Sequence, residues 1–226
     1  MTRCLVTSMK LLYITPFPPE PSGIADYAAG FAAAIARFCE VDVVASARGD
    51  RLSHSLPAVR ERMRDVRQRL RSSHYDLVHV ELGRSLLVSF FAALDIAIEY
   101  PKMPLVLTLH DPPGLVWHPL LFAGIKNIPL FNMAWAGLAW PTEWLLERSL
   151  YRRAAMLLTF SHRGRDLLQQ QKGLQDIRVI PMGVPVYPAR PASAQIRVGY
   201  YGYLYREKGV EVLIDALALL KQRQPR

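Results

Sequence analysis

The hydrophobic positions along the chain alternate between two periods, and this alternation predicts the order of its elements. Short, nearly continuous apolar runs are typical of strands, and they lie at Leu11–Thr15, Glu40–Ala45, Asp76–Leu82 and Met103–Asp111. Between these runs apolar residues recur every three or four positions, which predicts helices over Ala25–Phe38, Pro57–Arg71 and Arg84–Ile98. Strands that are apolar throughout suit a parallel sheet that is covered on both faces. The expected fold is therefore α/β, with a doubly wound, Rossmann-like parallel sheet.

The pattern changes after Asp111. The segment that follows, up to Trp144, contains prolines and tryptophans without a regular period, and a helix is expected after it, through Arg153. The alternation of strand and helix returns with "AMLLTFSHRGRDLLQQQ" and "IRVIPMGV". The stretch "PVYPARP" is a candidate linker, because proline cannot donate to a sheet ladder. We expect a first domain over residues 1–184, a linker over 185–195 and an incomplete second-domain stub over 196–226. The stub is expected to begin with a strand, which a turn and an amphipathic helix follow.

The loop after the first predicted strand is a candidate binding site. It reads "PFPPEPSGIADY" and leads directly into the first predicted helix. In an open parallel sheet, ligands bind beyond the carboxyl ends of the strands, where loops and helix N-termini meet. The prolines fix the path of this loop, and Gly23 lets the backbone approach a ligand closely. A rigid connector without a ligand is the alternative. The absence of GxGxxG and P-loop spacings argues against dinucleotide and NTP binding.

Composition narrows the class of protein. The chain has 226 residues, of which 51% are hydrophobic and 21% charged, as expected of a globular protein with a sizeable core. Its two cysteines have no CxxC or metal-ligand spacing, so a reducing compartment is the simpler assumption. The sequence shows neither a signal peptide nor an apolar run long enough to span a membrane. We therefore expect a soluble or peripheral protein.

The net charge of +9 favours a polyanionic partner. Six arginines fall between Pro57 and His74. They surround an apolar stripe made by Leu56, Val59, Met63, Val66 and Leu70. Two interpretations stay open: either the stripe packs on the sheet, or this helix and the tryptophans of residues 116–144 meet an anionic bilayer. Nucleic-acid binding is a weak alternative, because no recognised binding motif accompanies the arginines.

Five motifs carry a resemblance to a known family. They are "PFPPEPSGIADY", "LVLTLHD", "LLTFSHRGRDLL", "IRVIPMGV" and "GYLYREKGVEVLIDAL". Their order and intervals resemble the first half of family 4 glycosyltransferases of the GT-B fold, over nearly the whole chain. The resemblance implies an acceptor-side domain followed by the first unit of a nucleotide-sugar domain. It also implies retaining transfer of a sugar from a nucleotide sugar to a glycan or lipid-linked acceptor, catalysed by positioning and charge stabilisation.

The same resemblance implies which residues form the site. Ser22 and Gly23 would line the interdomain cleft and meet the donor phosphates, where family members often have two glycines. His110 would touch the transferred sugar, and a histidine that merely caps the strand end is the structural alternative. Asp26 would accept a hydrogen bond from an acceptor hydroxyl, although an acidic residue in the first turn also stabilises a helix by itself. Lys208 matches a family lysine that holds the donor diphosphate.

Two departures from the family pattern concern the donor side. The family usually has an arginine directly after the glycine of "GYLYREKG", but Tyr203 follows Gly202 in this chain, so Arg206 is the candidate substitute. The family's second half carries two glutamates separated by seven residues, and no such pair occurs in this sequence. The chain is therefore expected to be truncated and inactive by itself.

The remaining expectations concern partners and location. No cofactor or metal is expected, because no DxD-like carboxylate pair is present to hold a metal beside a diphosphate. The expected partners are a nucleotide sugar and a glycan or lipid-linked acceptor, with an anionic membrane surface as a candidate and no nucleic acid. The expected location is the cytoplasm, including the inner face of the membrane. The alternative function is a non-enzymatic interaction or membrane-peripheral module derived from a degenerate glycosyltransferase.

Overall fold

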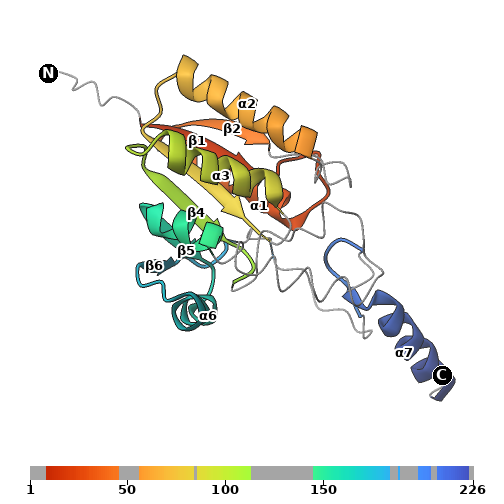
Figure 1. The fold of residues 1–226 in the computed structure, drawn as a ribbon. Helices are drawn as coiled ribbons and strands as arrows, with labels where there is room; N and C mark the ends of the chain where they lie inside the picture. The colour runs from red at the N-terminus through yellow and green to blue at the C-terminus, as the bar shows by residue number, and fades with distance from the viewer. Residues whose placement is uncertain are drawn as a thin grey trace, which may run out of the picture.

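A computed structural model describes residues 9–45, 56–83, 86–112, 145–183, 188, 198–204 and 208–223 (Figure 1). The strands are β1 (Lys10–Thr15), β2 (Glu40–Ala45), β3 (Leu77–Leu82), β4 (Leu105–Leu109), β5 (Met156–Thr159) and β6 (Ile177–Val179). The helices are α1 (Gly23–Ile35), α2 (Leu56–Ser72), α3 (Leu87–Glu99), α6 (His162–Lys172) and α7 (Val210–Arg223). Residues 145–153 are also helical. The predicted tryptophan-rich segment, most of the predicted linker and Arg206 lie outside the described residues.

The six strands form one parallel sheet in the order β2-β1-β3-β4-β5-β6. The chain moves outward from β1 to β2 and then returns past β1 to β3. The direction of winding therefore reverses between β1 and β3, and this switch point is where open α/β sheets bind ligands, beyond the carboxyl ends of the strands. The predicted doubly wound α/β sheet is confirmed.

The two faces of the sheet bury different kinds of side chain. One face is apolar: Leu12, Ile14, Val78 and Val80 pack with residues of α2 and α3 in the larger core. The opposite face packs Tyr13 against Ala28 of α1 in a smaller core. Figure 1 shows α2 and α3 in front of the sheet and α1 behind it. Because side chains alternate along a strand, the polar residues of β3 and β4 gather on the α1 face.

The apolar stripe of the arginine-rich helix packs into the protein. Val59 and Val66 of α2 are buried, and Leu70 packs against the larger core. This is the first of the two interpretations that the sequence left open. Val59, Val66 and Leu70 therefore face the protein interior and are not available for insertion into a bilayer.

Several predicted boundaries are shifted by one to three residues, and one predicted strand is not found in the described residues. The first helix was expected over Ala25–Phe38, but α1 covers Gly23–Ile35, because Ser22 is the N-cap residue and starts the helix two residues earlier. A strand was expected from residue 196, but residues 198–204 contain none. A strand needs a neighbour to pair with, and the described sheet ends at β6. None of the side chains of α7 is buried.

In the part of the chain that the structure describes, no helix is both long enough and apolar enough to cross a bilayer.

Candidate active site

The loops after β1, β3 and β4 converge at the switch point. Gly83 directly follows β3, and a Cβ atom on it would lie 2.9 Å from Cδ1 of Ile24 and 3.3 Å from Oδ2 of Asp111. Ile24 belongs to the first turn of α1, and Asp111 follows β4. The three segments therefore come close together at Gly83, where a larger residue would displace the side chain of Ile24.

His110 is held beside a buried carboxylate at this end of the sheet. It follows β4, and its backbone N–H donates to the carbonyl oxygen of Leu82 at 2.8 Å. Its Nε2 atom lies 2.7 Å from Oε2 of Glu81 in β3. The side chain of His110 is 6% exposed and that of Glu81 is fully buried. The imidazole is thus fixed from both its backbone and its ring.

Tyr13 completes a chain of three side chains across three strands. Its hydroxyl donates to Oε1 of Glu81 at 2.7 Å. Burial, and then the charge of Glu81, holds the pKa of Tyr13 well above its ordinary value. The phenol therefore stays protonated and remains a donor. This chain starts in β1 with Tyr13, continues in β3 with Glu81 and ends directly after β4 with His110. It therefore connects the two sides of the switch point.

His79 lies beneath this chain and remains uncharged. Its Nε2 atom is 2.6 Å from Oγ1 of Thr108 and 3.5 Å from Oε1 of Glu81. Burial lowers the pKa of His79, Glu81 acts in the opposite direction, and His110 lowers it further. A neutral His79 adds no charge to the group, so the charge of Glu81 is balanced by hydrogen bonds.

Aromatic rings enclose the imidazole of His110. The ring of Phe160, directly after β5, lies 4.9 Å from it, and the ring of Tyr27 in α1 lies 5.6 Å from it, both edge to face. Tyr27 and Phe160 also contact each other, at 5.2 Å. Burial, and then the charge of Glu81, raises the pKa of Tyr27, which stays neutral. The rings exclude water, and hydrogen bonds to His110 are correspondingly stronger.

The N-terminus of α1 carries three of the residues expected in the site. The Oγ atom of Ser22 accepts a hydrogen bond from the amide of Ala25 at 3.1 Å, so its hydroxyl caps the helix. Gly23 is exposed, and a Cβ atom on it would meet nothing within 4 Å, which leaves open space at the start of the helix. Asp26 is exposed, and its Oδ2 atom accepts a hydrogen bond from the hydroxyl of Tyr203 at 2.9 Å.

The residues expected on the donor side are not joined to this group. Lys208 is exposed and lies just before α7, and no contact links it to His110 or Ser22 within the described residues. Arg206 is outside them. Ser22, Gly23 and Asp26 thus lie at the start of α1, and His110 contacts the same helix through the ring of Tyr27.

Sequence reasoning missed Glu81, the most buried charged group of the site, together with Tyr13, Tyr27 and Phe160. A signal for Glu81 exists: polar residues occupy every second position in "LVHVEL" and again in "LTLHD". No group of three or more His, Cys, Asp or Glu side chains in the described ranges is placed to hold a metal ion.

Comparison with known proteins places this geometry in a family. The model of Glycosyltransferase Family 4 matches residues 21–186, a range that runs from the cap of α1 past β6 and includes Glu81 and His110. A search of curated proteins found no match. Since the matched range covers well over half of the 226 residues, the chain belongs to Glycosyltransferase Family 4.

Proposed function

We propose that the α/β domain of this chain is the acceptor-side half of a retaining glycosyltransferase. Such a glycosyltransferase transfers a sugar from a nucleotide sugar to a glycan or lipid-linked acceptor and needs no metal. The observation that carries the proposal is the chain of Tyr13, Glu81 and His110 at the switch point of a Family 4 domain. A buried, oriented imidazole lies where this fold class binds its ligands.

The site supplies positioning rather than a nucleophile. His110 contacts the transferred sugar, and the rings of Tyr27 and Phe160 keep water from it. The cap of α1 uses the amide of Ala25, so the amides of Gly23 and Ile24, which have no acceptor among the described residues, face the donor phosphate. Positioning and fixed dipoles of this kind stabilise the charge that develops during transfer.

The donor side of the proposed site consists of residues near the C-terminus. Residues 1–184 form the acceptor-side domain, 185–195 the linker and 196–226 the start of the nucleotide-sugar domain. Lys208, with Arg206, holds the donor diphosphate. Asp26 meets an acceptor hydroxyl, and its present hydrogen bond to Tyr203 shows that its carboxylate can accept one from a hydroxyl group.

Binding of the full chain to an array of glycans and lipid-linked saccharides tests this proposal. We expect binding to one class of acceptor, weakened about tenfold by His110→Ala, because one lost hydrogen bond of about 1.4 kcal/mol corresponds to that factor. The control is Arg178→Ala, which changes an exposed residue of the edge strand β6. The proposal is wrong if no glycan binds above background or if His110→Ala binds like the wild type.

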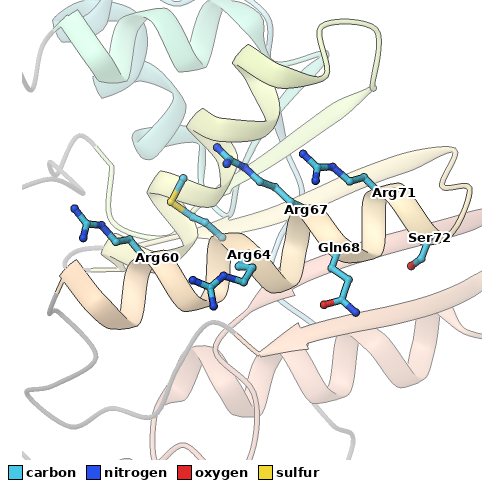
Figure 2. A pocket seen from close by; sticks show the side chains of 7 residues that line it. Arg60, Arg64, Arg67, Gln68, Arg71 and Ser72 are labelled. Atoms are coloured by element: carbon cyan, nitrogen blue, oxygen red, sulfur yellow. The ribbon is translucent and has the colours of Figure 1, made fainter.

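A second candidate function is attachment to an anionic membrane surface through α2. Arg60, Arg64, Arg67 and Arg71 lie within an arc of about 60° around the helix axis. They line a hollow of about 740 Å³ on the protein surface (Figure 2). Four cations on one side of a helix suit a plane of anionic headgroups.

The ion pairs of α2 reduce the charge that is available. Arg67 forms a bidentate pair with Asp95 of α3, with Nε 2.6 Å from Oδ2. Arg60, Arg64 and Arg71 are exposed and have no ion pair within the described residues. At about 1 kcal/mol for each basic residue near an anionic surface, the three contribute about 3 kcal/mol. Because the apolar stripe is buried, this attachment depends on charge and is sensitive to salt.

Co-sedimentation with vesicles tests the membrane hypothesis. We expect binding to anionic but not to neutral vesicles, weakened by salt and by the triple variant R60Q/R64Q/R71Q. The matched control, K102Q/R178Q/R223Q, removes three exposed charges from other elements. Equal sedimentation with and without anionic lipid contradicts the hypothesis, and so does equal loss in the two triple variants.

A further inference from the structure

The imidazole of His110 has one nitrogen turned into the protein. Nε2 faces Oε2 of Glu81 at 2.7 Å, and Nδ1 has no hydrogen bond to the described residues, so it is the ring atom left for a ligand. Which of the two nitrogens carries the proton decides whether Nδ1 donates or accepts a hydrogen bond. The surroundings of Glu81 determine that choice.

Two polar side chains lie against the oxygens of Glu81. The hydroxyl of Tyr13 donates a hydrogen bond to Oε1. Because the pKa of this phenol is raised, the proton stays on Tyr13. Hydrogen bonds donated to a carboxylate stabilise its charge. The neutral His79 lies 3.5 Å from Oε1 and is itself 2.6 Å from the hydroxyl of Thr108. An ionised carboxylate has no proton to donate, so at Oε2 it can only accept one from Nε2 of His110.

The other titratable groups near the imidazole do not compete with Glu81. The ring of Tyr27 lies edge to face with the imidazole of His110, at 5.6 Å between the ring centroids. Asp111, which follows His110 in the chain, has its Oδ2 atom beside Gly83. Among the described residues, Glu81 is thus the carboxylate in direct contact with the ring of His110.

We infer that Glu81 is a positioning residue for His110. Its buried carboxylate keeps a proton on Nε2, so that in the neutral imidazole Nδ1 is unprotonated and accepts a hydrogen bond from a hydroxyl group of the bound sugar. Tyr13 supports this arrangement by holding the second oxygen of Glu81. The part of the inference that concerns the sugar rests on the proposed function, whereas the part that concerns the proton does not.

Nuclear magnetic resonance of the full chain with ¹⁵N-labelled histidine tests the proton position. Long-range ¹⁵N–¹H correlations report which ring nitrogen is protonated, and His110→Gln identifies the signals of His110. We expect a single neutral tautomer in the wild type, with the proton on Nε2. In Glu81→Gln the side-chain amide presents either its oxygen or its NH₂ group to Nε2, so the tautomer with the proton on Nδ1 should appear.

Glu147→Gln is the matched control. Glu147 is also a fully buried glutamate, and it pairs with Lys172 at 2.9 Å. Both substitutions are expected to lower stability, because each changes a buried, hydrogen-bonded carboxylate. Only Glu81→Gln should change the signals of His110. A purely structural role for Glu81 predicts instead that both variants lose stability and that neither changes the tautomer.

The outcomes separate this inference from the proposed function. A proton on Nδ1 in the wild type overturns the inference, and this measurement does not depend on whether the variant folds. An unchanged tautomer in Glu81→Gln also overturns it. If the array finds a glycan, Glu81→Gln should bind it about tenfold more weakly, and wild-type binding by that variant refutes the positioning role. If no glycan binds but the tautomer responds, the proposed function fails and the control of the proton by Glu81 stands.

Discussion

Replacing Tyr13 with phenylalanine tests the buried carboxylate through its other partner. The hydroxyl of Tyr13 donates to Oε1 of Glu81 at 2.7 Å, and both side chains are fully buried. Phenylalanine keeps the ring, which lies 5.2 Å from the ring of Phe31 and 5.1 Å from that of His79. The substitution therefore removes one hydrogen bond and little else.

The expected cost follows from the charge on the acceptor. A hydrogen bond to a charged group contributes about 1.5–3 kcal/mol to stability, against about 1 kcal/mol for a neutral pair. The described residues place one other donor near Oε1, Nε2 of His79, at 3.5 Å, which is too long for a good replacement. We therefore expect Tyr13→Phe to lower the free energy of unfolding by about 2–3 kcal/mol.

Urea unfolding followed by far-ultraviolet circular dichroism measures this loss. The midpoint should fall while the slope with urea stays unchanged. Tyr27→Phe is the control, because the hydroxyl of Tyr27 makes no hydrogen bond to the described residues, and its cost should stay within about 0.5 kcal/mol. The loss should also be smaller in a Glu81→Gln background, where the acceptor is neutral. A cost for Tyr13→Phe no larger than that of the control would refute an ionised, Tyr13-dependent Glu81.

Three further predictions concern alkaline stability, turnover and local opening. Stability should fall above pH 10, because burial raises the pKa of Tyr13 and of Tyr151 above the ordinary value of 10.0. Above this pH the tyrosines ionise in the unfolded chain before they ionise in the folded one. The free energy of unfolding then falls by about 1.4 kcal/mol per pH unit for each tyrosine. Urea titrations at about pH 9 to 11 measure this fall, and a flat profile contradicts it. The chain purified alone should not turn over UDP- or GDP-sugars above background in a radiolabel transfer assay, because it lacks the paired glutamates, and transfer that depends on His110 would contradict this. Amides of α7 should exchange with solvent faster than those of β4, because no residue of α7 is buried. Equal protection in hydrogen-exchange mass spectrometry would show otherwise.

Most of the fold can be predicted from local pattern. β2 has the predicted bounds, Glu40–Ala45, because its apolar run is followed by "SARGD", whose residues suit a turn. The missing strand at residues 198–204 shows the limit of this reasoning. Its sequence suits a strand, but a strand forms only when another strand pairs with it, and the sequence of one segment does not contain that information.

The site was only partly predictable for the same reason. The position of His110 at the carboxyl end of a strand follows from the order of elements, and the structure has it directly after β4, the strand that pairs with β3 next to the switch point. Glu81 is not predicted as a site residue, because "DLVHVEL" is typical of an apolar strand. Its function depends on the register, which sets Tyr13 beside His79 and Glu81 beside Thr108. These pairings join residues far apart in sequence, and they gather the polar side chains of three strands under α1.

The arginines of α2 also differ from one another in contacts that their sequence spacing does not predict. The sequence gives their number and spacing, and by these criteria Arg67 is equivalent to Arg71. The fold makes them different, because Asp95, which lies 28 residues from Arg67, neutralises it from α3. On the other side of the helix Asp42 of β2 binds Arg69, with Nη1 2.6 Å from Oδ1. Replacing Arg67 would therefore break a helix–helix contact as well as remove a charge, and a loss of vesicle binding in that variant would not separate the two causes. Replacing Arg71 removes a charge and breaks no such contact. The triple variant at Arg60, Arg64 and Arg71 therefore tests electrostatic attachment without disturbing the packing of α2 on α3.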